Sequence, residues 1–178
     1  MNKVLAKDGA KGSAATIWLT GLPCSGKTTL AEQLKEKLWD RGIMAVHLDA
    51  DDIRKKLNVD LGFSQKDRVE NLRRVAHVAR LLNDNGILVI ASFVSPTNTM
   101  RQMVKGLIKN MKLVYLKCDL NICEKRDVKG MYKKARKGLI KEFTGISAPF
   151  EIPHKADLVL DTAKYSREYC VQRMLEMF

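Results

Sequence analysis

The residues best suited to phosphate chemistry lie in the segment Gly21-Leu22-Pro23-Cys24-Ser25-Gly26-Lys27-Thr28. This segment matches the pattern G-x-x-x-x-G-K-[ST] at every fixed position, and in that pattern the backbone N–H groups surround a phosphate chain. Lys27 is expected to reach the β- and γ-phosphates, while the Thr28 hydroxyl holds Mg²⁺. The segment therefore predicts a nucleoside triphosphate site, whose residues are Gly21, Cys24, Ser25, Gly26, Lys27, Thr28 and Thr29.

The residues on either side decide whether this pattern is a phosphate loop or a chance glycine turn. Residues 16–20 are apolar and β-prone, as a buried strand requires. Leucines at 30, 34 and 38 recur at the spacing of one helix face. A loop between a strand and a helix N-terminus aims N–H groups and the positive end of the helix dipole at an anion. This context favours the phosphate loop.

The remaining apolar runs predict four more strands, separated by helices. The strands are expected at 43–48, 87–91, 113–118 and 157–161, and the helices at 65–83, from Pro96 to about 110, at 121–125 and from Ser166 onward. Alternating strands and helices specify an α/β fold with a mostly parallel sheet. We expect a P-loop type, three-layer α/β/α domain with five strands. His47, inside the second strand, is interpreted as a structural histidine.

Polar residues follow these strands at the edge where parallel sheets bind ligands. The cluster Asp49-Ala50-Asp51-Asp52 follows the second strand, and Phe93-Val94-Ser95-Pro96 follows the third. The most basic region, residues 125–137, comes after the fourth strand. A charge run is usually a solvated helix face, but at this place in a nucleotide enzyme it favours a mobile lid, at about 125–145.

Length and composition indicate one domain. The chain has 178 residues, enough for one core, and we expect a flexible arm at 1–14 followed by a single domain at 15–178. The net charge of +12 permits nucleic acid binding, but the lysines are dispersed and lack interleaved aromatic residues. A cleft for two anionic nucleotides accounts for the charge better, so no nucleic acid partner is predicted.

The cysteines and the apolar runs bear on the cellular compartment. Cys24, Cys118, Cys123 and Cys170 have no paired metal or redox spacing, so reduced thiols are expected. No apolar stretch has the length of a signal peptide core or a membrane span. We therefore predict a cytoplasmic protein with no membrane partner.

A phosphate loop is compatible with a small-molecule kinase, a GTPase switch or a motor ATPase. No Asn-Lys-x-Asp guanine element is present, the chain is short for a helicase core, and the lid favours a kinase. The second substrate is expected to be anionic, because Arg54, Arg68, Arg73 and Arg74 exceed the needs of one triphosphate. Phe63 and Phe143, in polar and glycine-containing surroundings, are candidates for stacking a purine.

Several long segments resemble the adenylylsulfate kinase family, in order, from about residue 13 to 161. The most specific are G-F-S-x-x-D-R-x-E-N at 62–71 and K-G-x-Y-K-K-A-R at 129–136; L-D-A-D-D-I-R at 48–54, F-V-S-P at 93–96 and F-T-G-I at 143–146 accompany them. The resemblance implies transfer of the γ-phosphoryl group of ATP to the 3′-hydroxyl of adenosine 5′-phosphosulfate, with Mg²⁺. It also suggests a homodimer.

The resemblance also implies residue roles. The catalytic set is Lys27, Asp51 and Ser95; the substrate set is Asp51, Arg54, Phe63, Arg68, Asn71, Val94, Ser95, Lys129, Phe143 and Thr144. Asp51 would orient the ribose hydroxyl and accept its proton, and Phe63 and Phe143 would sandwich adenine. Thr28 and Asp49, the latter through water, would hold Mg²⁺, and lid cations including Arg126 and Arg136 would bind the phosphates of ATP. In the family the serine matching Ser95 is often described as a phosphorylated intermediate, although direct in-line transfer between two bound substrates needs none.

Three departures from the family leave a second reading open. Ala50 and Asp52 stand where Gly and Asn are usual, and Pro23-Cys24 stands where small residues are common. Residues 97–101 read Thr-Asn-Thr-Met-Arg where a Tyr and an Asp-Arg pair often follow. A kinase of the same fold acting on a different nucleotide ester is thus the alternative enzyme, and a non-catalytic nucleotide-binding or RNA-binding module is the alternative outside the enzymes.

Overall fold

A computed structural model of the chain describes residues 14–178 and has a five-stranded sheet at its centre. The strands are β1 (Thr16–Thr20), β2 (Ala45–Asp49), β3 (Leu88–Ser92), β4 (Met111–Lys117) and β5 (Leu158–Asp161). They lie in the order β2-β3-β1-β4-β5, and each neighbouring pair is parallel. The predicted five-stranded α/β sheet is confirmed, and all of its pairings are parallel.

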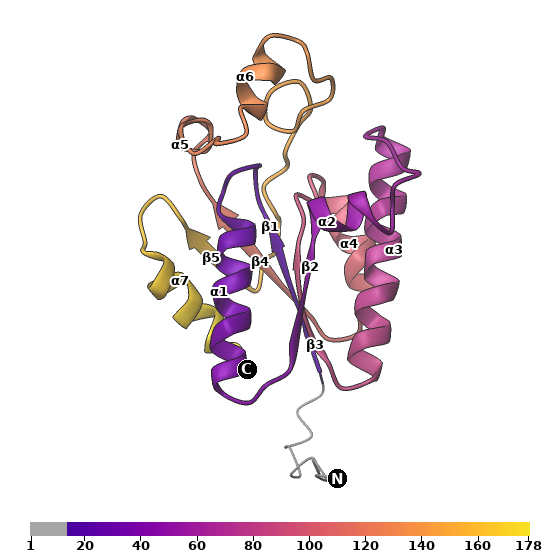
Figure 1. Cartoon of the computed structure of the whole chain (residues 1–178), viewed down its shortest axis with the longest axis vertical. Helices are drawn as coiled ribbons and strands as arrows, with labels where there is room; N and C mark the ends of the chain where they lie inside the picture. The colour runs from indigo at the N-terminus through magenta and orange to yellow at the C-terminus, as the bar shows by residue number, and fades with distance from the viewer. Residues whose placement is uncertain (1–13) are drawn as a thin grey trace.

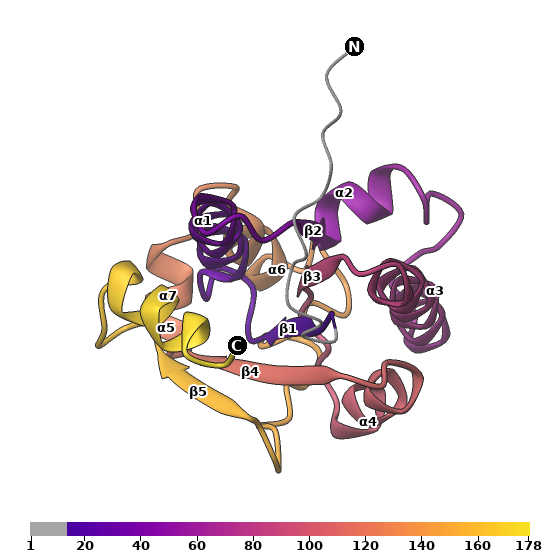
Figure 2. The ribbon, with the colours of Figure 1, turned by 90° about the horizontal axis from the view of Figure 1, so that it is seen from below.

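Helices cover both faces of this sheet. The helices among the described residues are α1 (Lys27–Asp40), α2 (Ala50–Lys55), α3 (Gln65–Asp84), α4 (Asn98–Leu107), α5 (Leu120–Lys125), α6 (Met131–Arg136) and α7 (Arg167–Leu175). In Figures 1 and 2, α1 and α7 lie on one side of the sheet and α3 and α4 on the other. Figure 1 shows α5 and α6 beyond the end of the sheet, separate from these two layers.

Alternate residues of β1 pack into two different hydrophobic clusters, because successive side chains of a strand point to opposite faces. Ile17 and Leu19 pack with the apolar residues of α1 and α7. Trp18 packs with those of α3 and α4, and stacks on Phe93 at 5.3 Å between ring centroids. All five residues of β1 are buried, as expected for the central strand of a parallel sheet.

The predicted strands and the predicted helices are all present, with ends displaced by up to a few residues. The start of α3 is confirmed: the Ser64 hydroxyl accepts a hydrogen bond from the Asp67 backbone N–H at 3.2 Å. The prediction that Pro96 opens the next helix was wrong. Thr97 caps α4, accepting from the Met100 N–H at 3.2 Å, and the helix ends at Leu107 rather than near 110.

The short helix α2, which follows β2 directly and carries the Asp51–Asp52 carboxylates, was not predicted. The arm predicted at 1–14 falls, except for residue 14, outside the described residues. Within the described residues, no helix has the combination of length and apolar character needed to cross a membrane.

Candidate active site

The phosphate loop joins β1 to α1 and has the tight backbone that anion binding requires. At Gly21 an added Cβ would lie 2.7 Å from both the Leu116 carbonyl oxygen and Ser25 Oγ, so only glycine fits. Gly26 precedes α1 with φ 95°, and Cys24 also has positive φ, 61°. Such left-handed residues turn successive N–H groups toward one point, and the helix dipole adds to the positive potential there.

Lys27 is buried within this loop. Its ammonium donates to the Gly21 carbonyl at 3.0 Å and to the Leu22 carbonyl at 2.6 Å. Burial is the main cause that lowers the pKa of Lys27 from 10.5 to about 8, partly offset by nearby acidic groups. The cation is therefore held at the loop by weak carbonyl acceptors, for which phosphate oxygens are a stronger substitute.

Thr28 and Asp49 meet beside the loop. The Thr28 hydroxyl donates to Asp49 Oδ2 at 2.8 Å, and the Asp51 backbone N–H donates to Asp49 Oδ1 at 2.9 Å. Burial alone would raise the pKa of Asp49, but the hydrogen bonds that it accepts hold the pKa below its usual value. An ionised carboxylate next to a hydroxyl suits Mg²⁺, which takes few protein ligands and keeps phosphate and water oxygens. The predicted metal residues thus fit the ion, although the described residues hold no cluster of three or more metal-ligating side chains.

Asp51 is brought next to this pair because α2 begins immediately after β2. Its Oδ2 accepts from Lys129 Nζ at 2.5 Å, so a lid residue reaches across to the end of β2. Both side chains are exposed. This hydrogen bond is the main cause that raises the pKa of Lys129 above 10.5. A carboxylate and a lid ammonium therefore stand together beside the phosphate loop.

Phe63 and Phe143, the two residues predicted to stack a purine, lie on two loops that Arg68 connects. The Arg68 guanidinium donates to the Phe63 carbonyl at 2.8 Å and to Thr144 Oγ1 at 3.1 Å. Phe63 is 60% exposed, and the Arg54 guanidinium lies 4.3 Å from its ring centroid. Phe143 is half-buried and meets the Tyr132 ring edge-on at 4.9 Å. The structure thus brings the α2–α3 loop and the lid side by side.

Two other residues predicted to bind the phosphoryl acceptor, Asn71 and Ser95, are buried, and Val94 beside Ser95 is partly buried. Asn71 is 3% exposed, and its side-chain oxygen accepts from Asn58 at 3.0 Å. Ser95 is 1% exposed with φ 44°, and its Oγ accepts from the Trp18 indole N–H at 2.9 Å. The carbonyl of Val94 accepts from the Thr20 hydroxyl at 2.6 Å. The turn after β3 is therefore held firmly against β1.

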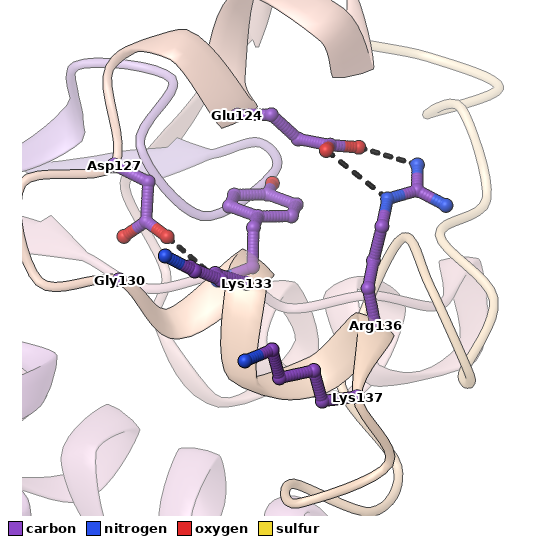
Figure 3. Close-up of a pocket in the computed structure, with 7 residues that line it drawn as sticks. Glu124, Asp127, Gly130, Lys133, Arg136 and Lys137 are labelled. Carbon is purple, nitrogen blue, oxygen red and sulfur yellow. Dashed lines mark hydrogen bonds and ion pairs between the residues drawn. The ribbon is translucent and has the colours of Figure 1, made fainter.

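The segment expected to form the lid, at about 125–145, begins where α5 ends and contains α6 and the loop that follows it. A cavity of about 480 Å³ lies beside α6. It is lined by Glu124, Asp127, Gly130, Tyr132, Lys133, Arg136 and Lys137 (Figure 3). Arg136 pairs with Glu124 at 2.5 Å. The Tyr132 hydroxyl donates to the Pro23 carbonyl at 2.9 Å, which attaches the lid to the phosphate loop.

Sequence reasoning did not identify Tyr132 as a contact of the loop, nor Thr162. The Thr162 hydroxyl donates to the Ser25 carbonyl at 3.0 Å, and its own carbonyl accepts from Arg126 at 2.7 Å. Arg126, predicted to bind nucleotide, is therefore tied to the loop through Thr162. The position of Thr162 directly after a predicted strand was the available signal.

At this site the phosphate loop lies beside the carboxylates of Asp49 and Asp51 and beside the basic segment that carries Lys129. The contacts of Thr28 with Asp49 and of Lys129 with Asp51 are the arrangement expected of a kinase of the P-loop class. The family model described as Adenylylsulphate kinase matches residues 13–161. The chain belongs to the adenylylsulphate kinase family, and it is a phosphotransferase.

Relatives support this assignment along most of the chain. The adenylyl-sulfate kinase of Bacteroides thetaiotaomicron is 52% identical over 163 residues, which are 90% of this chain and 81% of the relative. The probable adenylyl-sulfate kinase of Bacillus subtilis is 47% identical over 168 residues, covering 93% and 85%. Among solved structures, the Mycobacterium tuberculosis APS kinase in complex with AMPPNP and APS has a TM-score of 0.90 and 41% identity, covering 93% of this chain and 97% of that one.

Proposed function

We propose that the protein transfers the γ-phosphoryl group of ATP to the 3′-hydroxyl of adenosine 5′-phosphosulfate, giving ADP and 3′-phosphoadenylyl sulfate. The observation that carries this proposal is the Lys129–Asp51 contact at 2.5 Å, next to the Thr28–Asp49 pair. It combines a proton acceptor for a hydroxyl and a lid cation at the edge of the phosphate loop. An APS kinase with both ligand types bound shares this fold at a TM-score of 0.90.

Each residue near the loop contributes a separate part of this reaction. The loop N–H groups and Lys27 bind the phosphate chain and stabilise charge on the transferring group. Thr28 and Asp49 would hold Mg²⁺, which when bound neutralises the phosphate oxygens. Asp51 orients the ribose hydroxyl and accepts its proton, since a hydroxyl is a weak nucleophile. When adenosine 5′-phosphosulfate binds and its hydroxyl takes the place of Lys129 at Asp51, the Lys129 ammonium is free to bind the phosphosulfate group.

The acceptor would lie between the α2–α3 loop and the lid. In this proposal Phe63 and Phe143 stack the adenine, and Arg54, Arg68, Lys129 and Thr144 bind the phosphosulfate group. Asn71 and the Val94–Ser95 turn form the floor of the site. Arg126 and Arg136 contribute on the ATP side.

The proposed role of Ser95 is to position the turn. Its hydroxyl is buried and accepts from Trp18, and its carbonyl accepts from Arg101 at 2.6 Å. A phosphoryl group on Ser95 Oγ would need to displace the indole N–H and open the packing around β1. Direct in-line transfer requires neither change, and so we favour it.

The proposal also covers the domain organisation, the oligomeric state and the cellular compartment. Residues 15–178 act as a single domain with a lid at about 125–145, and the enzyme works as a homodimer in the cytoplasm. Size-exclusion chromatography with light scattering tests the dimer directly. A monomer that retains full activity would contradict it.

A coupled assay of ADP release with a panel of acceptors tests the activity. Adenosine 5′-phosphosulfate should support turnover at least about a hundredfold above AMP, ADP and other nucleotide esters. AMP lacks the terminal group that Arg54, Arg68 and Lys129 are proposed to bind, and ADP carries a more highly charged phosphate in its place. Turnover on another ester alone would favour the alternative kinase that the departures at Ala50, Asp52 and 97–100 leave open. No turnover on any acceptor, with normal ATP binding, would indicate a binding module.

A further inference from the structure

Glu32, His47 and Ser92 form a chain of contacts that leads to Asp49. His47 Nδ1 lies 2.5 Å from Glu32 Oε1, and His47 Nε2 lies 2.9 Å from Ser92 Oγ. The Ser92 hydroxyl donates to Asp49 Oδ2 at 3.0 Å. The same Oδ2 accepts from Thr28, so the contacts continue to the phosphate loop.

These contacts close a ring between one helix and two strands. Thr28 and Glu32 are four residues apart on α1, and His47 and Asp49 are two apart on β2, so each pair shares a face. Asp49 is the register partner of Ser92 in the parallel β2–β3 pair. The ring therefore depends on the packing of α1 over β2 and on the pairing of β2 with β3.

His47 is the buried member of this closed set of contacts. Its side chain is only 3% exposed, and both ring nitrogens have polar partners. The direct separation between His47 Nε2 and Asp49 Oδ2 is 3.9 Å, too long for a hydrogen bond, so Ser92 stands between them. A carboxylate only accepts hydrogen bonds, so His47 Nδ1 donates to Glu32. Ser92 donates its single hydroxyl proton to Asp49, so its oxygen accepts from His47 Nε2, and these two contacts fix the plane of the imidazole.

This geometry limits the freedom of the Asp49 carboxylate. Oδ1 accepts from the Asp51 backbone N–H, and Oδ2 accepts from Thr28 and Ser92. If Thr28 were to bind a metal instead of Asp49, Ser92 would remain as the side-chain donor that sets the direction of Oδ2. Residues that orient a metal-binding carboxylate typically change metal affinity or activity by 10- to 100-fold when removed.

We propose that His47 and Ser92 are positioning residues for Asp49: His47, held by Glu32, fixes the Ser92 hydroxyl, which aims the Asp49 carboxylate at the metal of the bound nucleotide. This inference rests on the proposed role of Asp49 in the kinase. His47 touches no substrate and acts through Ser92. Its function is thus more than the structural one expected for a histidine in a buried strand.

The test measures how strongly a divalent metal tightens nucleotide binding. ADP affinity is determined by calorimetry on the full chain, once with Mn²⁺ and once with EDTA, and the ratio of the two dissociation constants is the metal effect. His47→Leu and Ser92→Ala should each lower this ratio about tenfold, while ADP affinity in EDTA stays within about twofold. His47→Gln, whose amide nitrogen stands near the position of Nε2, should retain most of the ratio.

His77→Leu on the exposed face of α3 is the matched control and should leave the ratio unchanged. An unchanged ratio in folded His47→Leu and Ser92→Ala would overturn the proposal, as would an equal loss with Mn²⁺ and with EDTA. Should His47→Leu fail to fold, Ser92→Ala decides alone. The ratio needs no phosphosulfate, so its outcome is independent of whether the acceptor is correctly identified.

Discussion

The buried ammonium of Lys27 makes nucleotide binding depend on pH in a range where ordinary lysines do not titrate. Burial lowers its pKa from 10.5 to about 8, which corresponds to about 3 kcal/mol against the charged form. A polyphosphate needs the charged form. The association constant for ADP should therefore be nearly constant below about pH 7.5 and fall about tenfold per pH unit above about pH 8.

Neighbouring groups do not produce the same profile. Burial, followed by the nearby Asp127 carboxylate, raises the pKa of the Cys24 thiol above 9.0, and Asp51 raises that of Lys129 above 10.5. Neither group titrates between about pH 7 and about pH 8.5. The effect of Lys27 on the free energy of unfolding also has a distinctive sign. In the free protein Lys27 loses its proton at a lower pH than a lysine of the unfolded chain does, so the folded state gains stability as pH rises from about 8 toward 10.5.

Calorimetric titration with ADP in EDTA, at several pH values, measures this effect without metal. Lys27→Arg is the control, because a guanidinium stays charged throughout the range and should give a flat profile, whatever its absolute affinity. Wild-type ADP affinity that is equal at about pH 7 and about pH 9 would refute the reasoning. It would mean that the ammonium in the loop keeps the pKa of an exposed lysine.

Three further predictions concern single side chains. Asp51→Asn should lower kcat by about 10²- to 10⁴-fold with little change in KM for ATP; a decrease below about threefold in the ADP-release assay would exclude Asp51 as the base. Arg68→Ala should raise KM for adenosine 5′-phosphosulfate about tenfold or more by removing a charged ligand contact and the link between the two acceptor loops. Arg73 was expected from the sequence to serve the same substrate, but the structure pairs it with Glu70, so Arg73→Ala is the control. Tyr132→Phe should reduce the free energy of unfolding by about 1–2 kcal/mol, because it leaves the Pro23 carbonyl without its lid donor; denaturant titration measures this, and an unchanged midpoint would contradict it.

Several elements were predictable because their signals are local. The glycine and lysine positions of the phosphate loop and the apolar runs on either side specify a strand, a turn and a helix within about 25 residues of one another. The Ser64 cap was predictable for the same reason, since the donor is three residues away. The start of α4 was missed because Thr97 competes with Pro96 as the first residue of the turn, and only the backbone conformation distinguishes them.

The contacts within the site were not predictable in this way. The Lys129–Asp51 pair joins residues 78 positions apart, and the Arg68–Thr144 pair joins residues 76 apart. Their pairing depends on how the lid settles over the end of the sheet, where no sequence periodicity applies. A residue such as His47 illustrates the same limit, because its partner Ser92 becomes a neighbour only through β2–β3 pairing.

Sequence patterns were sufficient for the triphosphate loop, the α/β fold and the family, because each depends on residues close together or on long motifs. The tertiary structure alone decided which side chains meet at the carboxyl edge of the sheet: Asp51 with the lid lysine, Ser95 with Trp18, and Asp49 with Ser92 and His47. Strand order and lid position set these contacts. Both result from the packing of the whole domain, in which burial of apolar faces dominates over any local preference.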